Sequence, residues 1–130
     1  VLGSRGLGDV YKRQILLIAI VIKENFVNNC VIYCTVPNEF NANLIATTLI
    51  EENIAACVNI LPSVTSVYKW EGIVQTDNEM LLIIKTREEK FEEAEKKIKE
   101  LHEYSVPEII ALPIIKGSEE YQRWIVKETE

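Results

Sequence analysis

Two short apolar segments, each followed directly by a helix-start signal, constrain the fold more than any other feature of the sequence. Residues 31–36 are largely β-branched or apolar and stop at Pro37-Asn38, where proline removes a hydrogen-bond donor and asparagine can cap a helix. Residues 80–84 form a continuous apolar block, and Thr86 and Glu89 behind it have the spacing of a capping box. The sequence therefore predicts two strand-to-helix units, with the 80–84 strand central in a sheet.

Both predicted helices show apolar side chains at helical spacing. In residues 39–52 the 3.6-residue rhythm predicts a buried stripe with polar positions largely elsewhere. This stripe consists of Leu44, Ile45, Thr48, Leu49 and, one step on, Glu52. The helix that follows Thr86 has one apolar side made of Phe91, Ala94, Ile98 and Leu101. Its other side carries Glu–Lys pairs four residues apart, which is typical of a solvated helix face.

The remaining segments complete two β-α-β halves. Residues 56–61 and 64–70 read as one long strand that is bent at Pro62-Ser63, and Glu71-Gly72 offers a turn. Residues 108–115 form a last strand, in which Pro113 favours an edge position or a bulge. Gly117-Ser118 then begins a final helix, which carries Tyr121, Trp124 and Ile125.

These elements predict an α+β fold, namely a ferredoxin-like split β-α-β-β-α-β sandwich with an extra C-terminal helix, over residues 30–130. The helices would cover one face of an antiparallel sheet and leave the other face open. A bare apolar sheet face on a domain of this size needs a partner, and a second copy of the same chain is the simplest one. Homo-oligomerisation is therefore expected from the fold alone.

Residues 1–29 do not read as part of the domain. The first 14 residues lack an initiating Met and a regular pattern, so we interpret them as a tail, an expression remnant or an upstream read-through. The apolar run 15–22 follows Lys12 and Arg13 as in a signal peptide, but it is short and no small-residue cleavage site follows it. It is also far shorter than the roughly 20 residues that span a bilayer, so no membrane insertion is expected.

Charge and cysteine content restrict the partners and the compartment. The chain has 20 acidic and 14 basic residues, a net charge of -6, and its basic residues form no stripe that could follow successive phosphates. Nucleic acid is therefore not an expected partner. Three cysteines are an odd number and resemble no disulfide framework of a small secreted protein, which favours a reducing, cytoplasmic location.

His102, the only histidine, offers two interpretations. It either caps the end of the second helix or, together with a cysteine, forms a soft metal site suited to Cu(I) or Zn. The first strand and the second helix run toward the same edge of the predicted sheet, which makes Cys34 and His102 neighbours. The alternative for Cys34 and Cys57 is that each is a small buried apolar residue. Neither a nucleophile elbow nor a glycine-rich phosphate loop occurs, so we expect no enzyme activity.

Several segments together resemble a known family. In chain order they are CTVPNE, AACVNILP, SVYKWEG, LLIIKT, HEYSVPEII and YQRWI. Their order and spacing are similar to those of the CutA divalent-cation tolerance family, from Val31 to about Val126. The resemblance implies a homotrimer with PII-like architecture, a non-catalytic role in metal tolerance and homeostasis, and metal ions, copper foremost, as partners.

Residue by residue, the resemblance places copper ligands on Cys34 and His102, with other divalent cations also possible. Leu101 stands where some bacterial relatives have a second histidine, and Glu103 stands where proline is usual. Two alternatives remain open: a stable trimeric scaffold without a ligand, and a PII-like small-molecule sensor. In the sensor, an inter-subunit cleft suited to a small anion or nucleotide would be lined by Tyr68, Trp70, Lys85, Tyr104 and Trp124. The alternative is that these side chains only pack in the subunit interface.

Overall fold

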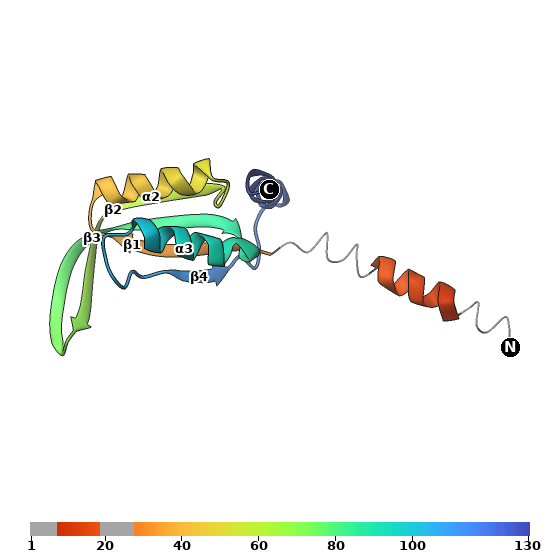
Figure 1. Cartoon of the computed structure of the whole chain (residues 1–130), viewed down its shortest axis with the longest axis horizontal. Helices are drawn as coiled ribbons and strands as arrows, with labels where there is room; N and C mark the ends of the chain where they lie inside the picture. The colour runs from red at the N-terminus through yellow and green to blue at the C-terminus, as the bar shows by residue number, and fades with distance from the viewer. Residues whose placement is uncertain (1–7, 19–27) are drawn as a thin grey trace.

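The computed structural model describes residues 8–18 and 28–130 (Figure 1). Residues 8–18 form a helix, and the first strand of the domain begins at Asn29. The predicted tail spans residues 1–29, and residues 1–7 and 19–27 of it lie outside the described residues. In the two described ranges, no helix is long and apolar enough to cross a membrane.

Four antiparallel strands form the sheet, in the order β2-β3-β1-β4. The strands are β1 (Asn29–Val36), β2 (Cys57–Trp70), β3 (Ile73–Arg87) and β4 (Ile110–Pro113). The helices are α2 (Glu39–Glu51), the short 3-10 turn η1 (Glu88–Lys90), α3 (Phe91–Leu101) and α4 (Glu119–Glu128). This is the predicted β-α-β-β-α-β order with an added helix; β3 is central, and Pro113 lies on the edge strand, as expected.

Alternation along β1 separates the two faces of the sheet. Every second side chain from Cys30 to Val36 is buried, in one cluster with residues of α2 and α3. The core that they form also contains Leu82, Ile84, Ala42, Ile45, Leu49, Ala94 and Ile98. Removing this apolar surface from water is the main favourable contribution to folding.

The opposite face of the sheet, which we call the open face, is apolar and only partly covered. Val31, Tyr33, Leu81 and Ile83 are half-buried there, and Leu61, Ile110 and Leu112 are exposed. Helix α4 reaches one end of this face, where the Tyr121 ring lies over the Lys85 ammonium group, 6.0 Å from ring centroid to Nζ. Most of the open face has no covering element in the described chain.

The β2–β3 hairpin is longer than expected and projects beyond the rest of the domain (Figure 1). The predicted bend is confirmed: the register shifts between Leu61 and Val64, and Ser63 has a φ of 61°. Glu71 and Gly72 both have positive φ, 51° and 80°, which makes a two-residue type I′ turn. Such a turn matches the twist of its strands, so pairing extends through residues 64–78, most of which are exposed.

Two local predictions are wrong. Thr86 does not begin a helix, because it lies in β3, is fully buried and donates its hydroxyl to the Ile54 carbonyl; α3 begins only at Phe91. The buried stripe of α2 is also rotated from the predicted one. The buried residues are Asn41, Ala42, Ile45, Ala46 and Leu49, while Leu44 is exposed.

Candidate functional site

The ends of β1 and α3 meet through His102. Its Nε2 lies 2.8 Å from the Thr35 carbonyl oxygen, and its Nδ1 lies 2.9 Å from the backbone N–H of Tyr104. A carbonyl can only accept and a backbone N–H can only donate. One neutral tautomer, with the hydrogen on Nε2, therefore satisfies both contacts.

The Cys34 thiol lies near the same carbonyl oxygen. Its side chain is fully buried on the core face of β1, and its Sγ lies 3.7 Å from the Thr35 oxygen. Burial, with the charges of Glu108 and Glu79, raises the pKa of the Cys34 thiol to about 12. The structure thus brings the two candidate ligands to one oxygen, with the thiol protonated at neutral pH.

The loop after α3 is held by two asparagines, one that precedes α2 and one in the first turn of α2. Asn38 caps α2 by accepting from the Asn41 backbone N–H, and its amide donates to the Glu103 carboxylate at 2.9 Å. The buried Asn41 side chain donates to the Leu101 carbonyl at 3.0 Å and accepts from the Glu103 N–H at 3.4 Å. Asn41 therefore links two helix ends, a role hidden by its place among polar neighbours in the sequence.

The side chains of Cys34 and His102 are of the types that bind soft metals, but their protons and hydrogen bonds oppose metal binding. Thiolate and imidazole are ligands for copper or zinc. The Cys34 thiol holds its proton, however, and both His102 nitrogens are used. Within residues 8–18 and 28–130, no group of three or more His, Cys, Asp or Glu side chains is arranged to hold a metal ion.

Directly outside this pair lies a hollow of about 700 Å³, which we call the Tyr104 hollow. It lies between the β2–β3 hairpin and the loop that follows His102. Its lining residues are Thr35, Ser66, Val67, Tyr68, Trp70, Glu79, Glu103, Tyr104, Ser105, Val106 and Glu108. Every charged side chain among them is a carboxylate.

Two tyrosines are tied to carboxylates at this hollow. Burial, and then the hydrogen bond with Glu79, raise the pKa of Tyr104 to about 12. The Tyr68 hydroxyl donates to Asp77, and this bond raises the pKa of Tyr68. Glu79 itself is buried, with only 7% of its surface exposed. The field in the hollow is therefore negative, and both phenols are neutral at pH 7.

The aromatic set predicted for a ligand cleft divides into two groups. Tyr68, Trp70 and Tyr104 line the Tyr104 hollow. Lys85 and Trp124 lie instead beside Tyr121, whose ring centroid is 5.4 Å from that of Trp124. Within one chain the two groups are therefore separate, and the cleft predicted between subunits stays a prediction.

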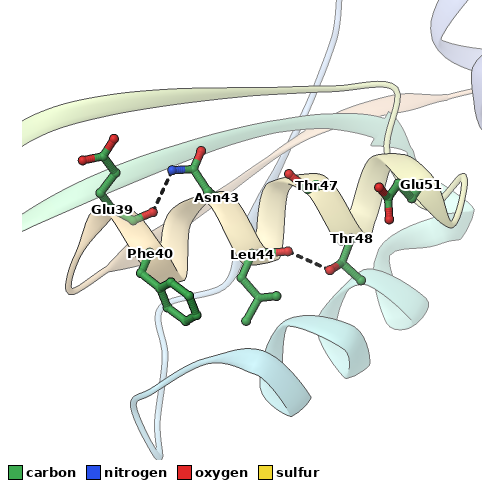
Figure 2. Close-up of a pocket in the computed structure, with 7 residues that line it drawn as sticks. All are labelled: Glu39, Phe40, Asn43, Leu44, Thr47, Thr48 and Glu51. Carbon is green, nitrogen blue, oxygen red and sulfur yellow. Dashed lines mark hydrogen bonds between the residues drawn. The ribbon is translucent and has the colours of Figure 1, made fainter.

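A second hollow, of about 610 Å³, lies on the outer side of α2 (Figure 2). Phe40 and Leu44 project from one side of the helix, as Figure 2 shows. The polar side chains Asn43 and Thr48 bond back to carbonyls of the same helix, at 3.0 and 2.7 Å. Two of the polar side chains of this shallow surface are therefore already bonded within α2, and the Tyr104 hollow is the better candidate site.

Comparison with known proteins assigns the family. The profile described as "CutA1 divalent ion tolerance protein" matches residues 30–128. The chain belongs to the CutA divalent-cation tolerance family. Solved structures of CutA proteins have a similar fold. The "Divalent cation tolerance protein (Cut A1)" from Thermus thermophilus has a TM-score of 0.77 and 47% identity, and the match covers 78% of this chain and 99% of that one. CutA1 from Oryza sativa has a TM-score of 0.78 and 50% identity, over 80% and 95%.

Curated CutA relatives differ in length. The "Divalent-cation tolerance protein CutA" of Thermus thermophilus is 48% identical over 99 residues, which are 76% of this chain and 96% of that protein. "Protein CutA, chloroplastic" of Arabidopsis thaliana is also 48% identical, over 79% of this chain but 57% of its own length. The chain thus spans nearly all of one CutA relative and little more than half of the other.

Proposed function

We propose that this protein is a homotrimeric, non-catalytic metal-binding protein of the cytoplasm that contributes to divalent-metal tolerance. Membership in the divalent-ion tolerance family supports the metal part of this proposal. The exposed apolar side chains on the open face support assembly, because such a surface is stabilised by burial against another copy. Three cysteines that are all free support a reducing compartment.

Copper is the metal that the donors Cys34 and His102 suit best, and their shared position at the Thr35 carbonyl carries this assignment. Binding requires the thiol to lose its proton and His102 to release one hydrogen bond. Because protons compete with metal for the ligand, the affinity for copper is weak at neutral pH and rises with pH toward the thiol pKa of about 12.

A copper titration tests this assignment. Cu(I) is added under anaerobic conditions, in competition with a chromogenic chelator, to the wild type and to a Cys34→Ala, His102→Ala double variant at several pH values. The wild type should bind more tightly, and its advantage should grow as the pH increases. Cys57→Ala serves as the control for loss of a thiol elsewhere. Equal affinities of the wild type and the double variant would exclude these ligands.

A second candidate function is that of a small-molecule sensor with PII-like architecture. The observation that favours it is the Tyr104 hollow, which has the volume of a small-ligand site and aromatic walls. Thermal denaturation with a panel of small solutes tests it: specific stabilisation is expected from at least one class. If no class raises the melting temperature, the alternative of a stable trimeric scaffold without a ligand is favoured.

A further inference from the structure

We propose that Cys57 and Lys85 form a reversible covalent cross-link, from sulfur to side-chain nitrogen, when the protein is exposed to hydrogen peroxide. Cys57 begins β2, and Lys85 lies near the end of β3. The two residues are direct partners in the antiparallel register, so their side chains leave the same face of the sheet. This inference is independent of metal binding at Cys34 and His102 and of the sensor function.

The two reacting atoms are already close together. The Lys85 Nζ lies 3.9 Å from the Cys57 Sγ. The side-chain oxygen of Asn59 accepts from the Lys85 ammonium group and, at 3.9 Å, from the Cys57 thiol. Directly opposed residues in antiparallel strands have Cβ atoms only about 4.5–5.5 Å apart. A bond between sulfur and nitrogen therefore requires rotation of side chains and no movement of the backbone.

Helix α4 of the same chain completes this cluster. Tyr121 forms a hydrogen bond with Cys57; burial, followed by the charge of Cys57 and by this bond, raises the pKa of Tyr121. The phenol is therefore protonated at neutral pH and can donate to an oxygen atom bound at the sulfur. Because β2, β3 and α4 all belong to one chain, these contacts exist whichever surface a neighbouring copy covers. Hydrogen peroxide is only slightly larger than water and needs no open binding site.

The other two thiols lack this environment. Cys30 and Cys34 are buried on the core face of β1, and burial raises the pKa of their thiols to about 11 and about 12. The thiolate is the form that reacts with peroxide, and these two thiols are protonated at neutral pH. Cys57 lies on the opposite face, beside an ammonium group that stabilises negative charge on the attacking sulfur. Oxidation is therefore expected at Cys57 first.

The cross-link forms in two steps, each of which releases water. In the first step the Cys57 sulfur attacks peroxide, the O–O bond breaks, and a sulfenic acid forms. In the second step the Lys85 ammonium group releases one proton to solvent, and its nitrogen attacks the sulfur. An S–N bond forms, the S–O bond breaks, and the departing hydroxyl takes a hydrogen from the nitrogen. The sulfur is oxidised and the peroxide is reduced; excess dithiothreitol later reduces the S–N bond and itself becomes a disulfide.

The cross-link also changes the charge between β3 and α4. The Lys85 ammonium group lies under the Tyr121 ring, 6.0 Å from its centroid, which is the geometry of a cation–π contact. The nitrogen of an S–N bond carries no positive charge. Oxidation therefore removes a cation and its attraction to α4, and reduction restores both.

Peptide mass spectrometry tests the cross-link. The full chain in its native assembly is treated with hydrogen peroxide, alkylated and digested with trypsin, with and without later dithiothreitol. A species should appear that joins the peptides of Cys57 and Lys85, lacks two hydrogen atoms and is not cleaved after Lys85. Fragmentation should place the bond at Cys57 rather than at Cys30 or Cys34, which lie in the same tryptic peptide. Dithiothreitol should abolish this species.

Three variants separate the two steps. Lys85→Arg keeps the positive charge, but its guanidinium group is a poor nucleophile. Its sulfenic acid should persist and be labelled by dimedone several-fold more than that of the wild type. Cys57→Ser should give neither product, and Cys30→Ala, the control for loss of another thiol, should cross-link like the wild type. Circular dichroism melting of each variant confirms that the fold is intact.

Several results would overturn the proposal. These are oxidation of Cys30 or Cys34 before Cys57, equal dimedone labelling of the wild type and Lys85→Arg, and a disulfide between copies of Cys57 in place of the cross-link. A product that is heavier by one oxygen atom would show that sulfur and nitrogen do not condense directly, and it would also overturn the proposed reaction. The copper titration remains a separate test, because Cys57 and Lys85 are not the proposed copper ligands.

Discussion

His102 connects the end of α3 to the end of β1 with both of its ring nitrogens. One of its two predicted roles was to cap the end of α3, but the carbonyl that its Nε2 contacts belongs to Thr35 of β1. The second nitrogen fixes the start of the next loop through Tyr104. Loss of the imidazole would therefore release the loop that forms one wall of the Tyr104 hollow.

The buried thiol of Cys34 predicts loss of stability at alkaline pH. Burial raises its pKa from 9.0 to about 12, so the unfolded chain releases this proton at lower pH than the folded chain does. The contribution to stability is fully present below pH 9 and is lost as the pH rises toward 12. Its size is on the order of 3 kcal/mol. Urea titrations across this range, at fixed protein concentration, measure it.

Two alanine variants separate this effect from general alkaline unfolding. Cys34→Ala should be less stable at neutral pH because it leaves a small cavity, but its stability should fall less steeply above pH 9. Cys30→Ala should remove a smaller part of the slope, since the pKa of Cys30 is raised only to about 11. The explanation is wrong if both variants keep the wild-type slope.

Among the elements, strands and helices were predictable wherever a local signal agreed with the tertiary structure. Asn38 and Ser118 cap α2 and α4 as their positions indicate. The Thr86 signal failed because a buried hydroxyl found a stronger partner in the distant Ile54 carbonyl. The 80–84 segment predicted only the continuous apolar part of β3, since the part nearer the Glu71-Gly72 turn is mostly exposed and is held by pairing with β2 rather than by burial.

The sequence predicted which elements meet at the candidate site, but not how their side chains are oriented there or that a hollow lies beside them. That Cys34 and His102 lie near one another follows from the parallel direction of β1 and α3. The buried orientation of the thiol and the two bonds of the imidazole depend on side-chain packing, which spacing does not encode. The Tyr104 hollow depends on the loop held by Asn38 and Asn41, and that contact joins residues about 60 positions apart.

The type I′ turn of the β2–β3 hairpin predicts opposite effects for its two residues. Glu71 adopts the left-handed region at a steric cost, so Glu71→Asn should stabilise the protein by about 0.5–1 kcal/mol. Gly72→Ala should destabilise it by about 1 kcal/mol. Nothing lies within 4 Å of a Cβ added at Gly72, so this cost comes from the local backbone conformation and not from a clash with other parts of the protein.

Chemical denaturation measures both changes, and Glu71→Gln is the control. Glutamine removes the charge of Glu71 without favouring the left-handed region, so it should leave stability near the wild-type value. If Glu71→Gln stabilises the protein as much as Glu71→Asn, the effect is electrostatic and the turn argument fails.

In the whole molecule, the outer surface of the helix layer and the open face of the sheet differ in polarity. The helix side is covered by charged residues, with ion pairs such as Lys97–Glu52 at 3.2 Å that also join α3 to the end of α2. The open face has half-buried aliphatic side chains in the centre of the sheet and exposed ones at its margins. An assembly of identical chains would bury the second surface and leave the first in solvent.

The homotrimer proposal predicts that a charge on the open face reduces assembly. Ile83 is half-buried in the central strand β3, so Ile83→Glu adds a charge that is tolerated by the single chain but is costly between chains. Sedimentation equilibrium should give a trimer for the wild type and smaller species for this variant. Leu44→Glu places the same charge on the outer side of α2, where Leu44 is 38% exposed, and should remain trimeric. A monomeric wild type, or equal dissociation of both variants, would contradict assembly through the open face.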